Sequence, residues 1–131
     1  MKTKSPVPAS TAPFAYEGLD RVIHERARLS VLTSLITHPD GLSFVELKRL
    51  CDLTDGNLAR HLQVLEEDGM VRLTKEADAG RAQTMARITA LGRKRYLEYL
   101  YTLERVVRDA ASALKENELH SPHLKLSPLK A

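Results

Sequence analysis

Two helix-start signals lie close together in the middle of this chain, and they constrain its fold more than any other feature. Ser43-Phe44-Val45-Glu46 matches a capping box, in which the serine and glutamate side chains satisfy free amides of a first helical turn. Thr54 can cap another helix after the short connection Asp52-Leu53, and Gly69 can stop that helix after about Asp68. The pattern therefore predicts two short helices joined by a tight turn.

A further helix is predicted before this pair. Asp20 is a candidate cap for it, and the turn residues His38-Pro39-Asp40-Gly41 end it. Its apolar residues form one stripe, which we expect to face the core: Ile23, Ala27, Val31, Leu32, Leu35 and Ile36.

A β-hairpin and a long helix are predicted after the pair. Val71 and Leu73 alternate with polar residues, and a polar tip over residues 76–81 leads to a returning strand that ends near Ile88. Thr89 can cap the last helix. The predicted class is therefore mainly α with a small β-hairpin, and its foremost packing is a winged helix-turn-helix with a long C-terminal dimerisation helix.

Length and composition agree with one domain. The 131 residues include 43% hydrophobic and 28% charged residues, with a formal charge of +3, which permits nucleic-acid binding without requiring it. Residues 1–14 lack the apolar stretch of a signal peptide, and no apolar run could cross a bilayer, so we expect a cytoplasmic protein without membrane contact. We expect a flexible arm over residues 1–18, a DNA-binding domain over 19–90, a dimerisation helix over 91–116 and a flexible tail over 117–131.

The helix over about residues 54–68 carries the main functional pattern. Leu58, Leu62 and Leu65 share one face, which must be buried. The other face presents polar side chains that suit the major groove, where Arg can pair with guanine and Asn or Gln with adenine. The candidate DNA contacts on this helix are Thr54, Asp55, Gly56, Asn57, Arg60 and Gln63.

The hairpin over about residues 72–88 offers a second set of candidate DNA contacts, at the backbone or the minor groove. They are Arg72, Lys75, Arg81 and Arg87. Glu76 and Asp78 near the tip favour the alternative of an ordinary solvated hairpin. His61, on the helix over about residues 54–68, could contact a phosphate. It lies toward the apolar side of that helix, however, so we interpret it as a partly packed structural side chain.

The run Leu53-Thr54-Asp55-Gly56-Asn57-Leu58-Ala59-Arg60-His61-Leu62, followed by Leu65-Glu66-Glu67-Asp68-Gly69-Met70-Val71, resembles winged-helix regulators related to the MarR and ArsR groups. Arg87-Ile88-Thr89 and Leu91-Gly92-Arg93 resemble the same group, and the similarity covers roughly residues 19–103. The resemblance implies transcriptional regulation by a dimer on double-stranded DNA. In such regulators the hairpin, here over about residues 72–88, is called the wing. Its acidic tip departs from the pattern of many relatives and argues against insertion of the wing into a DNA groove.

An apolar seam on the last helix predicts a homodimer. Its residues recur at alternating spacings of four and three: Leu100, Leu103, Val107, Ala110 and Leu114. We call the helix over about residues 54–68, which carries the candidate DNA contacts, the recognition helix. A twofold dimer would place its two recognition helices about one turn of DNA apart and would require a pseudo-palindromic operator.

Other functions receive less support from the residues. We find no enzyme motif and expect no catalytic residue, metal or cofactor, because phosphate loops and nucleophile signatures are missing and His120 and His123 lie in the tail. Cys51 suits a small core residue better than a redox sensor. The main alternative is a winged helix used for protein–protein contact. A small-molecule effector bound between the last helix and the DNA-binding core is a third reading, for which no ligand is indicated.

Overall fold

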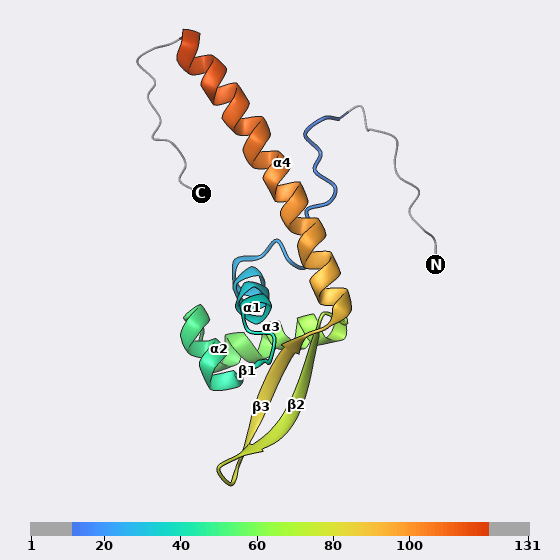
Figure 1. Cartoon of the computed structure of the whole chain (residues 1–131), viewed down its shortest axis with the longest axis vertical. Helices are drawn as coiled ribbons and strands as arrows, with labels where there is room; N and C mark the ends of the chain where they lie inside the picture. The colour runs from blue at the N-terminus through green and yellow to red at the C-terminus, as the bar shows by residue number, and fades with distance from the viewer. Residues whose placement is uncertain (1–11, 121–131) are drawn as a thin grey trace, which may run out of the picture. The chain divides into compact units, whose positions relative to one another are not determined.

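The computed structural model describes residues 12–120, and its helices and strands follow the predicted order (Figure 1). They are α1 (Arg26–Thr37), β1 (Leu42–Ser43), α2 (Phe44–Cys51), α3 (Asp55–Glu67), β2 (Val71–Asp78), β3 (Arg81–Ile88) and α4 (Ala90–His120). The described chain forms two compact units, one over residues 17–100 and one that combines residues 12–16 with 101–120.

The predicted caps of α2 and α3 are confirmed. The Ser43 hydroxyl accepts the Glu46 amide at 3.1 Å, and the Glu46 carboxylate accepts the Ser43 amide at 2.8 Å, which completes the capping box. The Thr54 hydroxyl accepts the Asn57 amide at 3.2 Å. Between the helices Asp52 adopts a left-handed conformation with φ of 55°, which ends α2 and lets α3 begin three residues later.

The prediction that Asp20 caps the first helix is wrong. Its carboxylate accepts the amides of Val22 and Ile23 at 2.9 and 3.3 Å, and so closes a separate turn before the helix. Glu25 caps α1 instead, accepting the Arg28 amide at 2.9 Å. A carboxylate that binds nearby amides stabilises a turn as readily as a helix start, so the local pattern alone did not distinguish the two.

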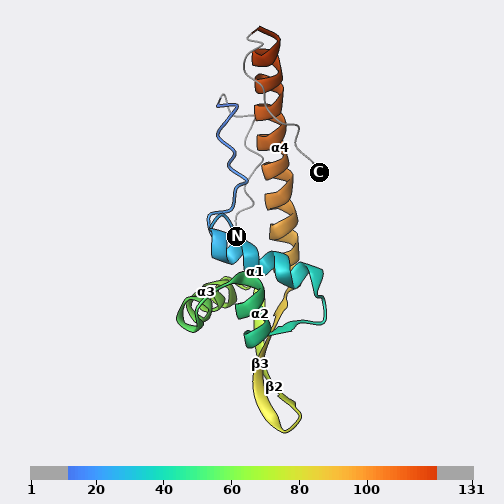
Figure 2. The ribbon, with the colours of Figure 1, turned by 90° about the vertical axis from the view of Figure 1, so that its left-hand side faces the viewer.

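The three strands form one antiparallel sheet in the order β1-β3-β2. Val71 lies opposite Ile88 and Asp78 opposite Arg81 in the hairpin, which extends away from α1, α2 and α3 (Figure 2). The short strand β1 was not predicted. It consists of Leu42 and Ser43, too short for a visible alternation, and exists because these residues pair with β3.

The core of the unit over residues 17–100 contains the predicted apolar stripes. Its buried members from α1 and α3 are Ala27, Val31, Leu32, Leu35, Leu58, Leu62 and Leu65, while Ile36 is only half-buried. Tyr96 and Tyr99 of α4 are also buried, and their hydroxyls bond to Thr33 at 2.7 Å and His24 at 2.6 Å. The first turns of α4 therefore belong to this core.

Thr89 holds the start of α4, as predicted. Its hydroxyl accepts the Gly92 amide at 3.0 Å and donates to the Gly69 carbonyl at 2.6 Å. The helix continues to His120, so the predicted boundary after residue 116 falls within it. The remaining parts of the predicted arm and tail, residues 1–11 and 121–131, lie outside the described residues, and so does His123.

Candidate nucleic-acid interface

The two faces of α3 differ as the sequence predicts. Leu58, Leu62 and Leu65 are buried. All six candidate DNA contacts on this helix are exposed: Thr54, Asp55, Gly56, Asn57, Arg60 and Gln63. The structure thus brings them together on one exposed polar surface, which we call the α3 face. A carbon added at Gly56 would meet no atom within 4 Å, so the backbone there is open to a close approach from outside.

Three polar contacts organise the α3 face. Lys48 of α2 pairs with Asp55 at 2.9 Å, which places a cation beside the carboxylate that would repel phosphate. Arg60 donates to the Asn57 side chain at 3.4 Å, and Gln63 donates to Glu67 at 3.2 Å. Sequence reasoning missed Lys48. Its spacing from Asp55 indicates nothing by itself, because the two residues lie on different helices.

His61 is packed, which confirms its interpretation as a structural side chain. It is 5% exposed, and Arg28 of α1 donates to its Nδ1 at 3.2 Å, a bond that requires this nitrogen to carry no proton. Burial lowers the pKa of His61, and the cations Arg60 and Arg28 lower it further against the opposing charge of Glu25. The neutral imidazole therefore joins the middle of α3 to α1.

The register of the hairpin separates the four predicted wing cations. Because side chains alternate along a strand, Arg72, Arg81 and Arg87 share one face, and Lys75 lies on the other. Arg72 and Arg81 are exposed, and Arg81 follows the positive-φ residue Gly80 at the tip. These positions leave Arg72 and Arg81 accessible from the same side.

Arg87 is engaged within the hairpin. Its guanidinium contacts Glu76 at 2.7 Å and the Thr74 hydroxyl at 3.3 Å. The hydrogen bond from Arg87 holds the pKa of Glu76 below its ordinary value, with a further contribution from Thr74. To contact DNA, Arg87 would have to give up this pair.

The proposed seam residues on α4 remain accessible. Leu100, Val107 and Leu114 are 37%, 46% and 41% exposed, Ala110 is exposed and Leu103 is half-buried. Within the unit that contains residues 12–16, the Tyr16 hydroxyl donates to Asp109 at 2.5 Å, and the Arg105 guanidinium lies 5.5 Å from the Tyr16 ring centre. Sequence reasoning placed Tyr16 in a flexible arm and missed this contact.

Other candidate sites receive no support from residues 12–120. No cluster of three or more metal-ligating side chains occurs within this range. None of its helices combines the length and apolar content that a membrane crossing requires. Cys51 is half-buried, with its sulfur 3.5 Å from the Ser34 hydroxyl, which differs from the fully packed core residue expected.

Comparison with known proteins identifies the class. Residues 27–107 match the winged helix DNA-binding domain family, and the chain belongs to this family. It is 36% identical over 86 residues to an uncharacterized protein of Methanocaldococcus jannaschii, in a match that covers 63% of this chain and 89% of that protein.

Solved structures agree with this assignment. The chain is similar to a transcriptional regulator homologue of Pyrococcus horikoshii OT3, with 29% identity and a TM-score of 0.64, covering 68% of this chain and 87% of that one. It shares its fold with MepR of S. aureus, solved in complex with DNA, at 16% identity and a TM-score of 0.61, covering 82% and 86% of the two chains. Together with the family match, these structures confirm the predicted winged-helix class and the stated resemblance to winged-helix regulators. Family and fold are those of regulators, which are not enzymes.

Proposed function

We propose that this protein is a sequence-specific transcriptional regulator that binds a pseudo-palindromic operator in double-stranded DNA as a homodimer. The α3 helix enters the major groove, and the hairpin β2–β3 lies at the backbone or the minor groove. The observation that carries the proposal is the α3 face, where every candidate contact is exposed while the opposite leucine face is buried. Binding to DNA also implies a cytoplasmic location.

The residues of the α3 face suit different parts of the duplex. The Arg60 guanidinium can form two bonds with a guanine edge, and the amides of Asn57 and Gln63 can do so with adenine. Gln63 would exchange its bond with Glu67 for one with a base. Thr54 and the free amides of the first turn of α3 suit a phosphate oxygen, since a helix amino end attracts anions. Gly56 has space around it and lets the duplex approach the backbone.

Among the wing cations, Arg81 is the principal proposed contact, because it is exposed at the tip of the hairpin. Arg72 lies on the same face and can reach a phosphate from the base of the hairpin. Arg87 supports this face through its pair with Glu76, and it contacts DNA only if that pair opens. Lys75 points from the opposite face and can contribute to the general positive potential.

The homodimer proposal rests on the seam Leu100, Leu103, Val107, Ala110 and Leu114. Arg105 and Asp109, which hold Tyr16, lie two positions before and after Val107 and therefore about 200° around the helix from it. Among the described N-terminal residues, Tyr16 thus lies on the side opposite Val107, and the apolar side is the one that we propose for a second copy of α4. The same face of both copies would be used, as in a twofold interface.

DNA binding measured against salt concentration tests the regulator proposal. We expect affinity to fall steeply as salt rises, because each phosphate contact releases counterions. Arg60→Ala should cost about 1–3 kcal/mol on the selected operator and relax its sequence preference, while Arg81→Ala should weaken all duplexes alike and reduce the salt slope by about one. Lys115→Ala, which removes an exposed cation outside the matched domain, serves as the charge control.

Absence of DNA binding even at low salt would refute the proposal and leave protein–protein contact as the main reading. Unchanged affinity and sequence preference for the double variant Arg60→Ala, Arg81→Ala would reject the assigned face while leaving the fold class intact.

A further inference from the structure

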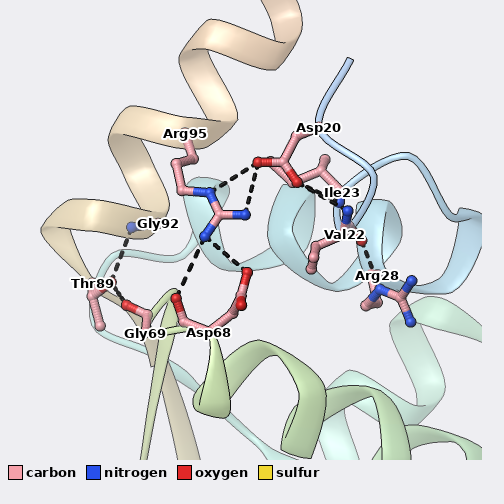
Figure 3. A network of polar contacts seen from close by, with 9 residues as sticks. All are labelled: Asp20, Val22, Ile23, Arg28, Asp68, Gly69, Thr89, Gly92 and Arg95. Carbon is pink, nitrogen blue, oxygen red and sulfur yellow. Dashed lines mark hydrogen bonds and ion pairs between the residues drawn. The ribbon is translucent and has the colours of Figure 1, made fainter. Parts of the chain in front are cut away.

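Arg95 joins three segments that are far apart in the sequence (Figure 3). Its guanidinium contacts the Asp20 carboxylate at 2.8 and 2.9 Å and the Asp68 carboxylate at 2.8 Å, and it reaches the Asp68 carbonyl at 3.5 Å. Asp20 belongs to the turn before α1, and Asp68 is the C-cap residue that directly follows α3. One side chain of α4 thus connects the start of the fold to the end of the recognition helix.

The surroundings of Arg95 distinguish it from the adjacent cations. Its side chain is 24% exposed, and those of Asp20 and Asp68 are 19% and 39% exposed. Arg93 and Lys94 are exposed. Since the Arg95 donors already face two carboxylates, this residue is poorly suited to bind phosphate, whereas its neighbours remain available. The run Arg93-Lys94-Arg95 therefore contains residues with different tasks.

The turn held by Arg95 also reaches the middle of α3. Asp20 accepts the amides of Val22 and Ile23, and the Val22 carbonyl accepts Arg28 Nε at 2.6 Å. Arg28 in turn donates to His61 at 3.2 Å. The recognition helix is thereby held at its end through Asp68 and at its centre through His61, with the same N-terminal turn connected to both points.

Besides the Arg95 and His61 contacts, hydrogen bonds of Thr89 join the end of α3 to the start of α4. Gly69 follows Asp68 with φ of +77°, and its carbonyl accepts the Thr89 hydroxyl at 2.6 Å. The same hydroxyl accepts the Gly92 amide. Because these bonds and the Arg95 pairs act on adjacent residues, the end of α3 is fixed against the first turns of α4 from two sides.

We propose that Arg95 is a positioning residue for operator recognition: by pairing with Asp68 and Asp20 it sets the angle between α3 and α4, and thereby the half-site spacing that the dimer accepts. This inference rests on the proposed function. Arg95 and the proposed dimer seam belong to one continuous helix, so a change in the angle of α3 against the first turns of α4 moves the two recognition helices relative to each other. The planar guanidinium suits this role, because it holds two carboxylates in a fixed geometry.

The test measures spacing preference rather than affinity alone. The wild type first selects a duplex from a random pool, and its two half-sites are then moved apart or together in single base-pair steps up to about half a helical turn. For each protein the ratio of affinities between the best and the worst spacing is measured. We expect Arg95→Gln to lower this ratio about tenfold, with unchanged binding to unrelated DNA, because the partly buried charge-assisted contacts with Asp20 and Asp68 are both lost.

Three further variants make the test specific. Asp68→Asn keeps the Arg95–Asp20 pair and should also lower the ratio. Arg95→Lys keeps the charge but lacks the planar guanidinium, so its affinity ratio should lie between those of Arg95→Gln and the wild type. Arg93→Gln removes an exposed cation from the same turn and should leave the ratio unchanged.

Several results would overturn the inference. One is a set of affinities for Arg95→Gln that equals the wild type at every spacing, or that falls by the same factor at every spacing. Another is a drop in the ratio for Arg93→Gln as large as the drop for Arg95→Gln. If circular dichroism shows that both Arg95→Gln and Asp68→Asn fail to fold, the role of Arg95 is to stabilise the fold and not to position α3 for operator recognition. A wild type that binds DNA with salt dependence but without spacing preference refutes only this inference, whereas no DNA binding at all refutes the proposed function.

Discussion

A single methyl group added at Gly92 should destabilise the protein, although Gly92 lies in a helix where alanine is normally preferred. A Cβ at this position would lie 2.2 Å from the Met70 carbonyl oxygen, 2.9 Å from Ile88 Cγ1 and 3.0 Å from the Met70 carbonyl carbon. The Met70 oxygen also accepts the Thr89 amide at 3.0 Å. The added carbon would therefore push against backbone at the junction where α3, β2 and α4 meet.

The magnitude follows from opposing effects on the free energy of unfolding. Alanine in a helix interior is favoured over glycine by about 1 kcal/mol. Against this gain, overpacking that moves backbone costs about 1–3 kcal/mol, and weakening the bond between Thr89 and Met70 costs about 1 kcal/mol more. We therefore expect Gly92→Ala to lower the free energy of unfolding by about 1–3 kcal/mol.

Urea unfolding at one fixed protein concentration measures this change, and Gly56→Ala provides the matched control. Gly56 also lies in a helix, but a Cβ there meets nothing within 4 Å. The control should therefore gain about 0.5–1 kcal/mol from helix propensity while losing affinity for DNA, because the methyl group narrows the approach to α3. A Gly92→Ala protein as stable as the wild type, or more so, would show that α4 does not approach Met70 this closely.

Three further predictions concern pH, helix capping and assembly. Burial lowers the pKa of His61 from its ordinary value of 6.5, so the unfolded chain takes up a proton more readily than the folded chain. The free energy of unfolding should therefore be full above about pH 6.5 and fall as the pH drops from there through the lowered folded-state pKa, and His61→Gln should flatten this slope in urea titrations below about pH 6.5. Ser43→Ala should lower the free energy of unfolding by about 1 kcal/mol in the same assay through loss of the capping box, and no change would contradict the role of this cap. Val107→Asp should shift sedimentation toward the monomer at micromolar concentration, because a charge would face the apolar seam of the partner helix. Arg108→Asp, at the adjacent position, is the control, and a dimer that persists in Val107→Asp would contradict the seam.

Local patterns predicted much of the fold. Ser43 and Thr54 indicate the starts of their helices correctly because a cap joins atoms only three residues apart, within one stretch of sequence. The spacing of Leu58, Leu62 and Leu65 likewise determines which face of α3 is buried, since helical periodicity is a property of the segment itself. The exposure of the α3 face follows from the same periodicity, so the candidate contacts on this helix could be recognised without any tertiary information.

The sequence by itself therefore determined the order of the elements, the buried stripes and the exposed polar face. Only the tertiary structure decided which charges meet. Arg95 lies 75 residues from Asp20, and Tyr16 lies 93 residues from Asp109. With 20 Lys and Arg residues and 17 Asp and Glu residues, charge alone allows many pairings, and none has a local spacing that marks it. The pairing of Arg87 with Glu76, the cation Lys48 beside Asp55 and the hold of Arg95 on α3 arise because the packed backbone brings these side chains within bonding distance.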